Sequence, residues 1–401
     1  MNSSQAHKPQ LLIVLSRFPF PLEKGDKLRA FYQIKELSKT YDITLFATSD
    51  SKVSMAHQQM LETYCSRIVI AYIPKWRRTL SLALALFSEL PFQVHYFYSN
   101  LARKKIKSLV EENEYKHIYC QLIRTTEYVK NIHHIPKTLD YMDALSTGIE
   151  RRIERRHWYD KWLFRLEAKR LKKYELKIFD FFENHTIISR QDRQLISHPE
   201  REKIHCIPNG IAPSFFETLE RPEEYDFVFV GNMSYPPNID AVKYMVEAIL
   251  PKFPASKLLV SGATPHPSLV KIAQHNSQLE ITGWVEDIRD AYLNGKIFLA
   301  PMKIGTGMQN KLLEAMALKT PCITTDLANN PIEATDGKEI LVGNTSEEII
   351  SQMKYLLESS ETRTQIAAAA QDFVKEKYSW EETTYQLIEI MNQNHVESTI
   401  K

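Results

Sequence analysis

The sequence lacks long apolar runs. None of its 401 residues belongs to a stretch of the roughly 18 consecutive apolar residues that a membrane-spanning helix requires. The first residues, MNSSQAHK, contain no apolar core of a signal peptide. We therefore expect neither secretion nor a membrane-spanning segment. The apolar run at 80–87 is too short to cross a bilayer, and we expect it to form a core helix or an interfacial helix.

Cysteine is scarce, and the patterns of metal sites are missing. The thirteen histidines show no HExxH motif, so we expect no metal and no other cofactor. The four cysteines show no CxxC spacing, and three of them lie in apolar, strand-like runs. Buried thiols in a reducing compartment, the cytoplasm, are the expectation for Cys65, Cys120, Cys206 and Cys322.

An excess of one charge is absent from the chain as a whole. With 51 basic and 49 acidic residues the net charge is +2, which argues against a general attraction to nucleic acid. Residues 151–177 differ, because eleven Arg or Lys stand there against four Asp or Glu, with aromatic residues interleaved. Such a helix suits the anionic inner face of a membrane, or it is a solvated helix whose aromatics pack on the domain. No nucleic-acid recognition motif accompanies it.

Apolar runs alternate with helical patterns along the chain, as a parallel sheet with crossover helices requires. The length allows two domains. We predict an α/β protein of two doubly wound, Rossmann-like domains, with ligand between them and residues 208–224 as the linker. The expected strands are 11–16, 43–47, 67–72, 117–120, 137–141 and 185–189 in the first domain, and 226–230, 257–261, 279–282, 297–300 and 322–325 in the second.

The segment 301–317, PMKIGTGMQNKLLEAMA, reads as a strand end, a glycine turn and a helix. Gly305 and Gly307 allow a ligand to approach the backbone, and the helix presents unpaired N–H groups to an anion. Lys311 and Glu314 share roughly one face of that helix. A lysine beside an anion site and a nearby carboxylate suit a nucleotide diphosphate, with the carboxylate accepting ribose hydroxyls.

This segment resembles the donor-site signature of GT-B glycosyltransferases, in particular of the retaining family numbered four. The family motif has two glutamates separated by seven residues. Glu314 matches the second glutamate, and Thr306 stands in the place of the first. An arginine usual after the first strand of the second domain is replaced here by Asn232.

The resemblance extends over nearly the whole chain. Residues 208–211, PNGI, resemble the interdomain motif, 283–287, GWVED, the turn that commonly faces the nucleobase, and 378–381, YSWE, the start of a terminal segment that crosses back to the first domain. The segments 17–21, RFPFP, and 24–29, KGDKLR, resemble a bacterial branch associated with exopolysaccharide assembly. The implied domains are 1–205 on the acceptor side, 206–377 on the nucleotide-sugar side, and a terminal helix at 378–401.

The resemblance implies a cytoplasmic hexosyltransferase, peripheral on the inner face of the membrane if 151–177 makes contact. It would move a sugar from a nucleotide diphosphate to a glycan or polyprenyl-linked acceptor, with retention and without a metal. The implied donor-binding residues are Asn209, Gly210, Gly231, Asn232, Trp284, Val285, Gly305, Thr306, Gly307, Gln309, Asn310, Lys311 and Glu314. A nucleotide-sugar epimerase of the same fold and a non-catalytic partner subunit are the alternatives.

Residues at strand ends in the first domain complete the expected site. Gly25, Asp26, Lys27 and Arg29 follow the first strand and would meet the diphosphate or the acceptor. Lys311, Lys303, or one of the cations Lys27 and Arg29 would substitute for the missing arginine, or donor binding is weakened. Asp143, near Asp140, would orient or deprotonate the acceptor hydroxyl as a catalytic residue beside Lys311 and Glu314, although both aspartates fit helix N-caps equally well.

Overall fold

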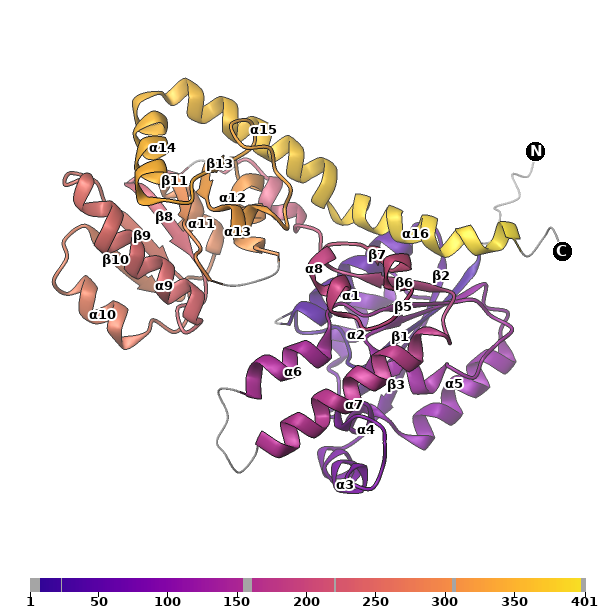
Figure 1. Cartoon of the computed structure of the whole chain (residues 1–401). Helices are drawn as coiled ribbons and strands as arrows, with labels where there is room; N and C mark the ends of the chain where they lie inside the picture. The colour runs from indigo at the N-terminus through magenta and orange to yellow at the C-terminus, as the bar shows by residue number, and fades with distance from the viewer. Residues whose placement is uncertain (1–7, 23, 154–160, 220, 305–307, 398–401) are drawn as a thin grey trace, which may run out of the picture. The chain divides into compact units, whose positions relative to one another are not determined.

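The computed structural model describes residues 8–22, 24–153, 161–219, 221–304 and 308–397 (Figure 1). The chain divides into two compact units. The first comprises Met1–Asn209 and Thr383–Lys401, and the second Gly210–Glu382. The division therefore falls between residues 209 and 210, four residues beyond the expected boundary at 205. Each unit is an α/β body with its own parallel sheet.

The sheet of the first unit has seven parallel strands in the order β3-β2-β1-β4-β5-β6-β7. Its central strands are almost fully buried, because crossover helices cover a parallel sheet on both faces. Register pairs Leu12 with Thr44 on one side and with Ile118 on the other. The strands are β1 Gln10–Leu15, β2 Asp42–Ser49, β3 Arg67–Tyr72, β4 His117–Gln121, β5 Lys137–Asp140, β6 Asn184–Ile187 and β7 His205–Cys206.

The first helix of this unit, α1, begins at Gly25, which places Asp26 and Lys27 in its first turn. The helices are α1 Gly25–Leu37, α2 Met55–Glu62, α3 Lys75–Ala85, α4 Phe92–Phe97, α5 Asn100–Glu112, α6 Leu145–Ile153, α7 Lys161–Phe179 and α8 Arg190–Leu195, with 3₁₀ turns η1 Ile123–Tyr128 and η2 Arg201–Lys203.

The last helix, α16 (Trp380–Glu397), belongs to the first unit from Thr383 onward. Leu387, Ile390 and Met391 are buried in the same apolar cluster as residues of β1, β2 and α1. The hydroxyl of Tyr41 also donates a hydrogen bond to Asn392 Oδ1 at 3.2 Å. The chain thus closes the core of its first unit with its last helix.

The second unit holds six parallel strands in the order β10-β9-β8-β11-β12-β13. They are β8 Tyr225–Val230, β9 Leu258–Ser261, β10 Leu279–Gly283, β11 Gly295–Ala300, β12 Cys322–Thr324 and β13 Leu341–Val342. The helices and turns are η3 Pro213–Phe216, α9 Pro236–Tyr244, the π-helical turn η4 Met245–Ile249, the 3₁₀ turn η5 Leu250–Lys252, α10 Pro267–Ala273, α11 Ile288–Leu293, α12 Asn310–Ala317, α13 Asp326–Asn329, α14 Ser346–Glu358 and α15 Ser360–Tyr378.

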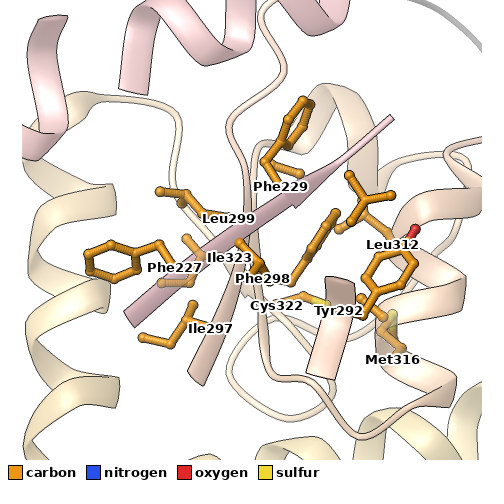
Figure 2. Close-up of a cluster of buried hydrophobic side chains, with 14 of the residues drawn as sticks. Phe227, Phe229, Tyr292, Ile297, Phe298, Leu299, Leu312, Met316, Cys322 and Ile323 are labelled. Carbon is orange, nitrogen blue, oxygen red and sulfur yellow. The ribbon is translucent and has the colours of Figure 1, made fainter. Parts of the chain in front are cut away.

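Aromatic and aliphatic side chains of β8, β11 and α12 form the core of this unit (Figure 2). Phe229 and Phe298 stack with their ring centroids 6.3 Å apart. Leu312 and Met316, four residues apart on α12, are fully buried in the same cluster. The buried side of α12 is therefore fixed by packing, which sets the direction in which Lys311 and Glu314 point.

The fold class and all eleven strands expected from the sequence are confirmed. The sequence did not reveal β7 and β13, because two residues are too few to show a period. Helix α9 ends at Tyr244 and is followed directly by η4 and η5. Cys65, Cys120 and Cys322 are buried as expected, whereas Cys206 is only half-buried. Within the described residues, no helix combines the length and apolar character needed to span a membrane.

A fully buried ion pair joins α1 to β5 in the first unit. Arg29 Nε donates to Asp140 Oδ2 at 2.7 Å, and neither side chain has any exposed area. The hydroxyl of Tyr119 donates to the same carboxylate oxygen at 2.8 Å. The remaining guanidinium nitrogens donate to the carbonyl oxygens of Ile207 and Pro208. Arg29 thus ties the first helix, the sheet and the end of the unit together.

We predict that Arg29→Met destabilises the first unit by about 3–5 kcal/mol, since it leaves the Asp140 carboxylate buried without its partner. Urea unfolding followed by circular dichroism measures this change. Lys107→Met is the matched control, because Lys107 pairs with Glu111 at an exposed position and its loss should cost less than about 1 kcal/mol. Equal unfolding midpoints for the two variants would show that the buried pair does not hold the unit together.

Candidate functional site

Three neighbouring strands of the second unit end on glycine or are followed at once by glycine. Gly231 follows β8, Gly262 follows β9, and Gly283 ends β10. Gly262 has φ +141°, and a Cβ on it would lie 1.8 Å from the carbonyl oxygen of Gly231. No other residue fits at Gly262 without displacing backbone. The carboxyl ends of β8 and β9 therefore meet more closely than side chains would allow.

Gly231 is also the point where two helices approach the end of β8. A Cβ on Gly231 would lie 2.6 Å from Asn238 Nδ2, on α9, and 3.4 Å from Lys311 Nζ, on α12. Lys311 Nζ donates to Asn238 Oδ1, and Asn238 Nδ2 donates to the carbonyl oxygen of Asn232 at 2.9 Å. The amide of Asn238 is thereby oriented, and it fixes the lysine above the glycine.

The lysine is held in partly apolar surroundings. Its Nζ lies 4.8 Å from the centroid of the Phe229 ring, in cation–π contact. Burial lowers the pKa of the Lys311 ammonium to about 8, and the carboxylate of Glu314 partly opposes this shift. A lysine in such surroundings gains from an incoming anion, because the anion replaces the water that the lysine has lost.

Glu314 lies one turn further along α12 and is held by a buried tyrosine. The hydroxyl of Tyr292, on α11, donates to Glu314 Oε2 at 2.7 Å, and Tyr292 is fully buried. Burial raises the pKa of the Glu314 carboxyl, while the bond from Tyr292 and the charge of Lys311 work against the rise. A carboxylate with one oxygen fixed in this way can accept hydroxyl hydrogens with the other.

The turn before α12 carries the rest of the expected donor signature. Gly305, Thr306 and Gly307 lie outside the described residues. The helix itself begins at Asn310, directly after Gln309. Lys303, expected as one substitute for the missing arginine, places its Nζ 3.3 Å from the centroid of the Tyr244 ring.

The residues expected near the base and at the domain junction are placed as follows. Trp284 comes directly after β10 and is 73% exposed, and Val285 is half-buried beside it. Asn209, the last residue of the first unit's main segment, accepts a hydrogen bond from Arg29 through Oδ1 at 3.0 Å. Gly210 packs against Trp380, whose backbone nitrogen would lie 2.6 Å from a Cβ on the glycine.

A basic cavity lies at the carboxyl ends of β1 and β2 in the first unit. Its volume is about 450 Å³. Lys27 lines it, and its Nζ donates to the carbonyl oxygen of Phe20 at 2.8 Å. Asp26 accepts a hydrogen bond from Arg17 at 2.7 Å, and neither Asp26 nor Gly25 is among the residues that line the cavity. The other charged or titratable lining residues are Arg17, Lys24, Asp50, Lys52, His57, Arg78 and Tyr96.

Arg29 and Asp143, both expected at the site, differ in burial. Arg29 was expected to meet a phosphate, but this assignment is wrong, because the side chain is buried and bonded to Asp140, Ile207, Pro208 and Asn209. Asp140 is accordingly a structural partner of Arg29. Asp143 is exposed near the end of β5, and its catalytic role stays a prediction.

Asn238 and Tyr292 are the residues that the sequence did not point to. Both act on α12 from other helices, and both are buried, with Asn238 3% exposed. Neither belongs to a motif, and their distances from Lys311 and Glu314 along the chain carry no signal. Only the meeting of strand ends and helices reveals them. Among the described residues, no group of three or more His, Cys, Asp or Glu side chains is placed to hold a metal ion.

Part of the second unit matches a known protein family. Residues 224–359 match the family model of glycosyl transferases group 1. A relative from Klebsiella pneumoniae, described as an uncharacterized 44.6 kDa protein in cps region, is 24% identical over 92% of this chain and 96% of its own length.

Solved structures share the fold over almost the full length. Sucrose-phosphate synthase from Thermosynechococcus elongatus superposes with a TM-score of 0.63 at 14% identity, covering 98% of this chain and 100% of the other. Alr3699/HepE from Anabaena, solved in complex with UDP, has a TM-score of 0.64 at 12% identity, covering 96% and 99%. At these identities the likeness shows the fold, and the family match shows the activity class. Residues 224–359 are thus a group 1 glycosyltransferase domain, and the chain is a glycosyltransferase of the GT-B fold.

Proposed function

We propose that this glycosyltransferase moves a sugar from a nucleotide diphosphate to a glycan or lipid-linked acceptor in bacterial polysaccharide or glycoconjugate synthesis, with retention of configuration. The observation that carries the proposal is the pair on α12, a half-buried lysine and a tyrosine-held carboxylate at glycine-lined strand ends. The relative from a cps region fits a role in polysaccharide synthesis.

In the proposed site the donor nucleotide would lie along α12 in one orientation. The diphosphate would lie at Lys311 and the N-terminus of α12, where cation and helix dipole both favour negative charge. The ribose hydroxyls would donate to Glu314, and the base would lie near Trp284. Alr3699/HepE was solved with UDP and with UDP-glucose, which supports a nucleotide sugar as the donor class.

Catalysis would rest on stabilising the leaving diphosphate as its charge develops. Lys311 is already oriented by Asn238, so little reorganisation is needed when the sugar–phosphate bond breaks. We propose that this lysine and the backbone amides of the turn and helix do the work without a metal ion. Thr306 would stand beside the donor sugar, in place of the family's first glutamate.

The acceptor would enter through the first unit. Its basic cavity is lined by Arg17, Lys24, Lys27 and Arg78, which suits an acceptor carrying phosphate or carboxylate groups. We further propose that residues 151–177 contact the inner face of the membrane, where a polyprenyl-linked acceptor would reside. Asp143 is then available to orient the acceptor hydroxyl.

A thermal-shift panel of nucleoside diphosphates and nucleotide sugars tests the donor site. A ligand at 100 times its dissociation constant stabilises by about 2.7 kcal/mol, or about 5–10 °C for a unit of this size. We expect one base series to raise the melting temperature, and Glu314→Ala to weaken its binding about 10–100-fold through loss of the ribose contact. Glu361→Ala, an exposed carboxylate at the start of α15, is the matched control and should bind as the wild type does.

Product analysis with the donor that binds separates the remaining activities. A new glycoside with the donor's anomeric configuration, measured by NMR, supports a retaining transferase. A changed sugar without a glycoside would indicate an epimerase, and no shift with any nucleotide would favour a non-catalytic subunit. Either result would overturn the proposal.

The pH dependence of nucleotide binding tests Lys311. Because its pKa is about 8, the ammonium is largely charged at pH 7 and largely neutral at pH 9. If only the charged form binds the diphosphate, the dissociation constant should rise about tenfold between these pH values. Isothermal titration measures this change.

Lys311→Arg provides the control for that titration, since arginine stays charged throughout the range. We expect weaker binding overall in this variant, but no rise of the dissociation constant from pH 7 to pH 9. A rise of equal size in the variant and the wild type would assign the titration to another group.

A further inference from the structure

Helix α3 carries a row of exposed large apolar side chains on its outward side, beside the exposed Lys75, Arg77, Thr79 and Ala83. The sequence suggested either a core helix or an interfacial helix for 80–87, and the exposed areas exclude the core. Trp76 is 62% exposed, Leu80 55%, Leu84 61%, and Phe87, just beyond the helix, 92%. Their spacing of four, four and three residues places them on one side of the helix. Such a contiguous apolar face needs a partner.

The opposite side of α3 is anchored in the first unit. Arg78 is 3% exposed, and its Nε donates to the carbonyl oxygen of Ile73 at 3.1 Å. Its guanidinium carbon lies 4.9 Å from the centroid of the Phe97 ring, and the side chain lines the basic cavity. The helix is therefore a folded, anchored part of the first unit, and its apolar residues are exposed in the folded state.

Helix α7 continues this surface with positive charge. Arg170, on α7, donates to the carbonyl oxygens of Ala85 at 2.7 Å and Leu86 at 3.2 Å, so the two helices are in contact. Trp162, at the start of α7, is 58% exposed. Figure 1 shows α3, α4 and α7 gathered at the same end of the first unit. The exposed basic residues of α7 are Arg165, Lys169, Lys172, Lys173 and Lys177.

The acidic residues of α7 do not offset that charge, because both are turned inward. Glu167 accepts hydrogen bonds from the backbone nitrogens of Phe92 at 2.7 Å and Gln93 at 3.0 Å, at the start of α4. Glu175 accepts from the nitrogen of Ser146 at 2.9 Å, at the start of α6. Helix α3 contains no acidic residue. The solvent-facing charges of both helices are thus all positive.

An apolar groove opens beside the exposed face. Its volume is about 520 Å³, and α3, α4, α6 and α7 line it with side chains that include Leu82, Leu86, Phe92, Ile149, Leu163 and Phe164. Two acidic residues lie here, since Glu167 lines the groove and the exposed Glu89 pairs with Lys173 at 3.2 Å. Apolar side chains, a groove and an excess of basic residues on α7 match the chemistry of an anionic lipid surface, in which hydrocarbon lies beneath negatively charged headgroups.

We infer that the outward face of α3, together with the basic face of α7, docks the first unit onto an anionic lipid bilayer. This rests on the proposed function in one respect, the lipid-linked acceptor, and it assigns the inserting element to α3, outside residues 151–177. Trp76, Leu80, Leu84 and Phe87 enter the interface between headgroups and acyl chains, while the lysines and arginines of α7 remain at the headgroups. Arg78 then holds the basic cavity close to the headgroup layer.

Vesicle co-sedimentation of the full chain tests this inference. The vesicles are phosphatidylcholine alone, or phosphatidylcholine with about one third phosphatidylglycerol. We expect the wild type to bind the anionic vesicles and to leave them at high salt, where the Debye length falls to ~3 Å. The double variant Leu84→Glu with Phe87→Glu should lower the partition coefficient about tenfold or more. The double variant Lys169→Glu with Lys172→Glu should do the same for anionic vesicles only.

Leu101→Glu is the matched control, because Leu101 is 61% exposed on α5 and belongs to neither α3 nor α7. It should bind vesicles as the wild type does. Melting temperatures and nucleotide binding of all variants show whether each unit is intact, and they separate a failure of docking from a failure of the donor site. Equal vesicle binding by wild type and the Leu84/Phe87 variant, or no binding by the wild type, would overturn the inference. A wild-type dimer that the same variant dissociates, without any vesicle binding, would assign the face to a second copy of the chain.

Discussion

The site in the second unit depends on the absence of a side chain at one position. Gly231 lies where the end of β8 meets Gly262 of the neighbouring loop, Asn238 of α9 and Lys311 of α12. Any Cβ there would push away the asparagine that orients the lysine. Because these contacts are made by the folded unit alone, the cation is in place before a ligand arrives, and such preorganisation is what allows a charged group to stabilise developing charge.

The two units each hold a buried or half-buried cationic side chain, and the partners of the two side chains differ. In the first unit, Arg29 is fully enclosed, and its charge is matched by Asp140 at 2.7 Å, so the pair serves the architecture. In the second, Lys311 is half-buried with an amide and an aromatic ring as its nearest partners, and the nearby carboxylate of Glu314 is held by Tyr292. A lysine whose pKa falls to about 8 weakens the fold slightly, and such a cost is consistent with the anion site proposed at this position.

The sequence predicted the sheets well because the buried strands are continuous apolar runs. Such a run can be recognised from the sequence without knowing any tertiary contact. It predicted Lys311 and Glu314 because three residues along one helix place them on one face. It could not show that Arg29 turns inward to Asp140, since the two are 111 residues apart and both residue types are common at ligand sites. The roles of Asn238 and Tyr292 could not be predicted for the same reason, because their contacts with α12 form only when separate helices pack against the sheet.

Helix α3 contributes side chains both to the basic cavity and to the exposed apolar face. Its inward residue, Arg78, contributes to the basic cavity, and its outward residues form the apolar face. The cavity and the face are therefore held at a fixed separation by a rigid element a few turns long. A lipid-linked acceptor with a charged head and a hydrocarbon tail would place its head in the cavity while its tail stays in the membrane. An enzyme docked on the same membrane through the apolar face would then encounter this acceptor at a high effective concentration. The charge exposed on α7 is positive because both of its glutamates are buried, where they accept hydrogen bonds from backbone nitrogens at the starts of α4 and α6.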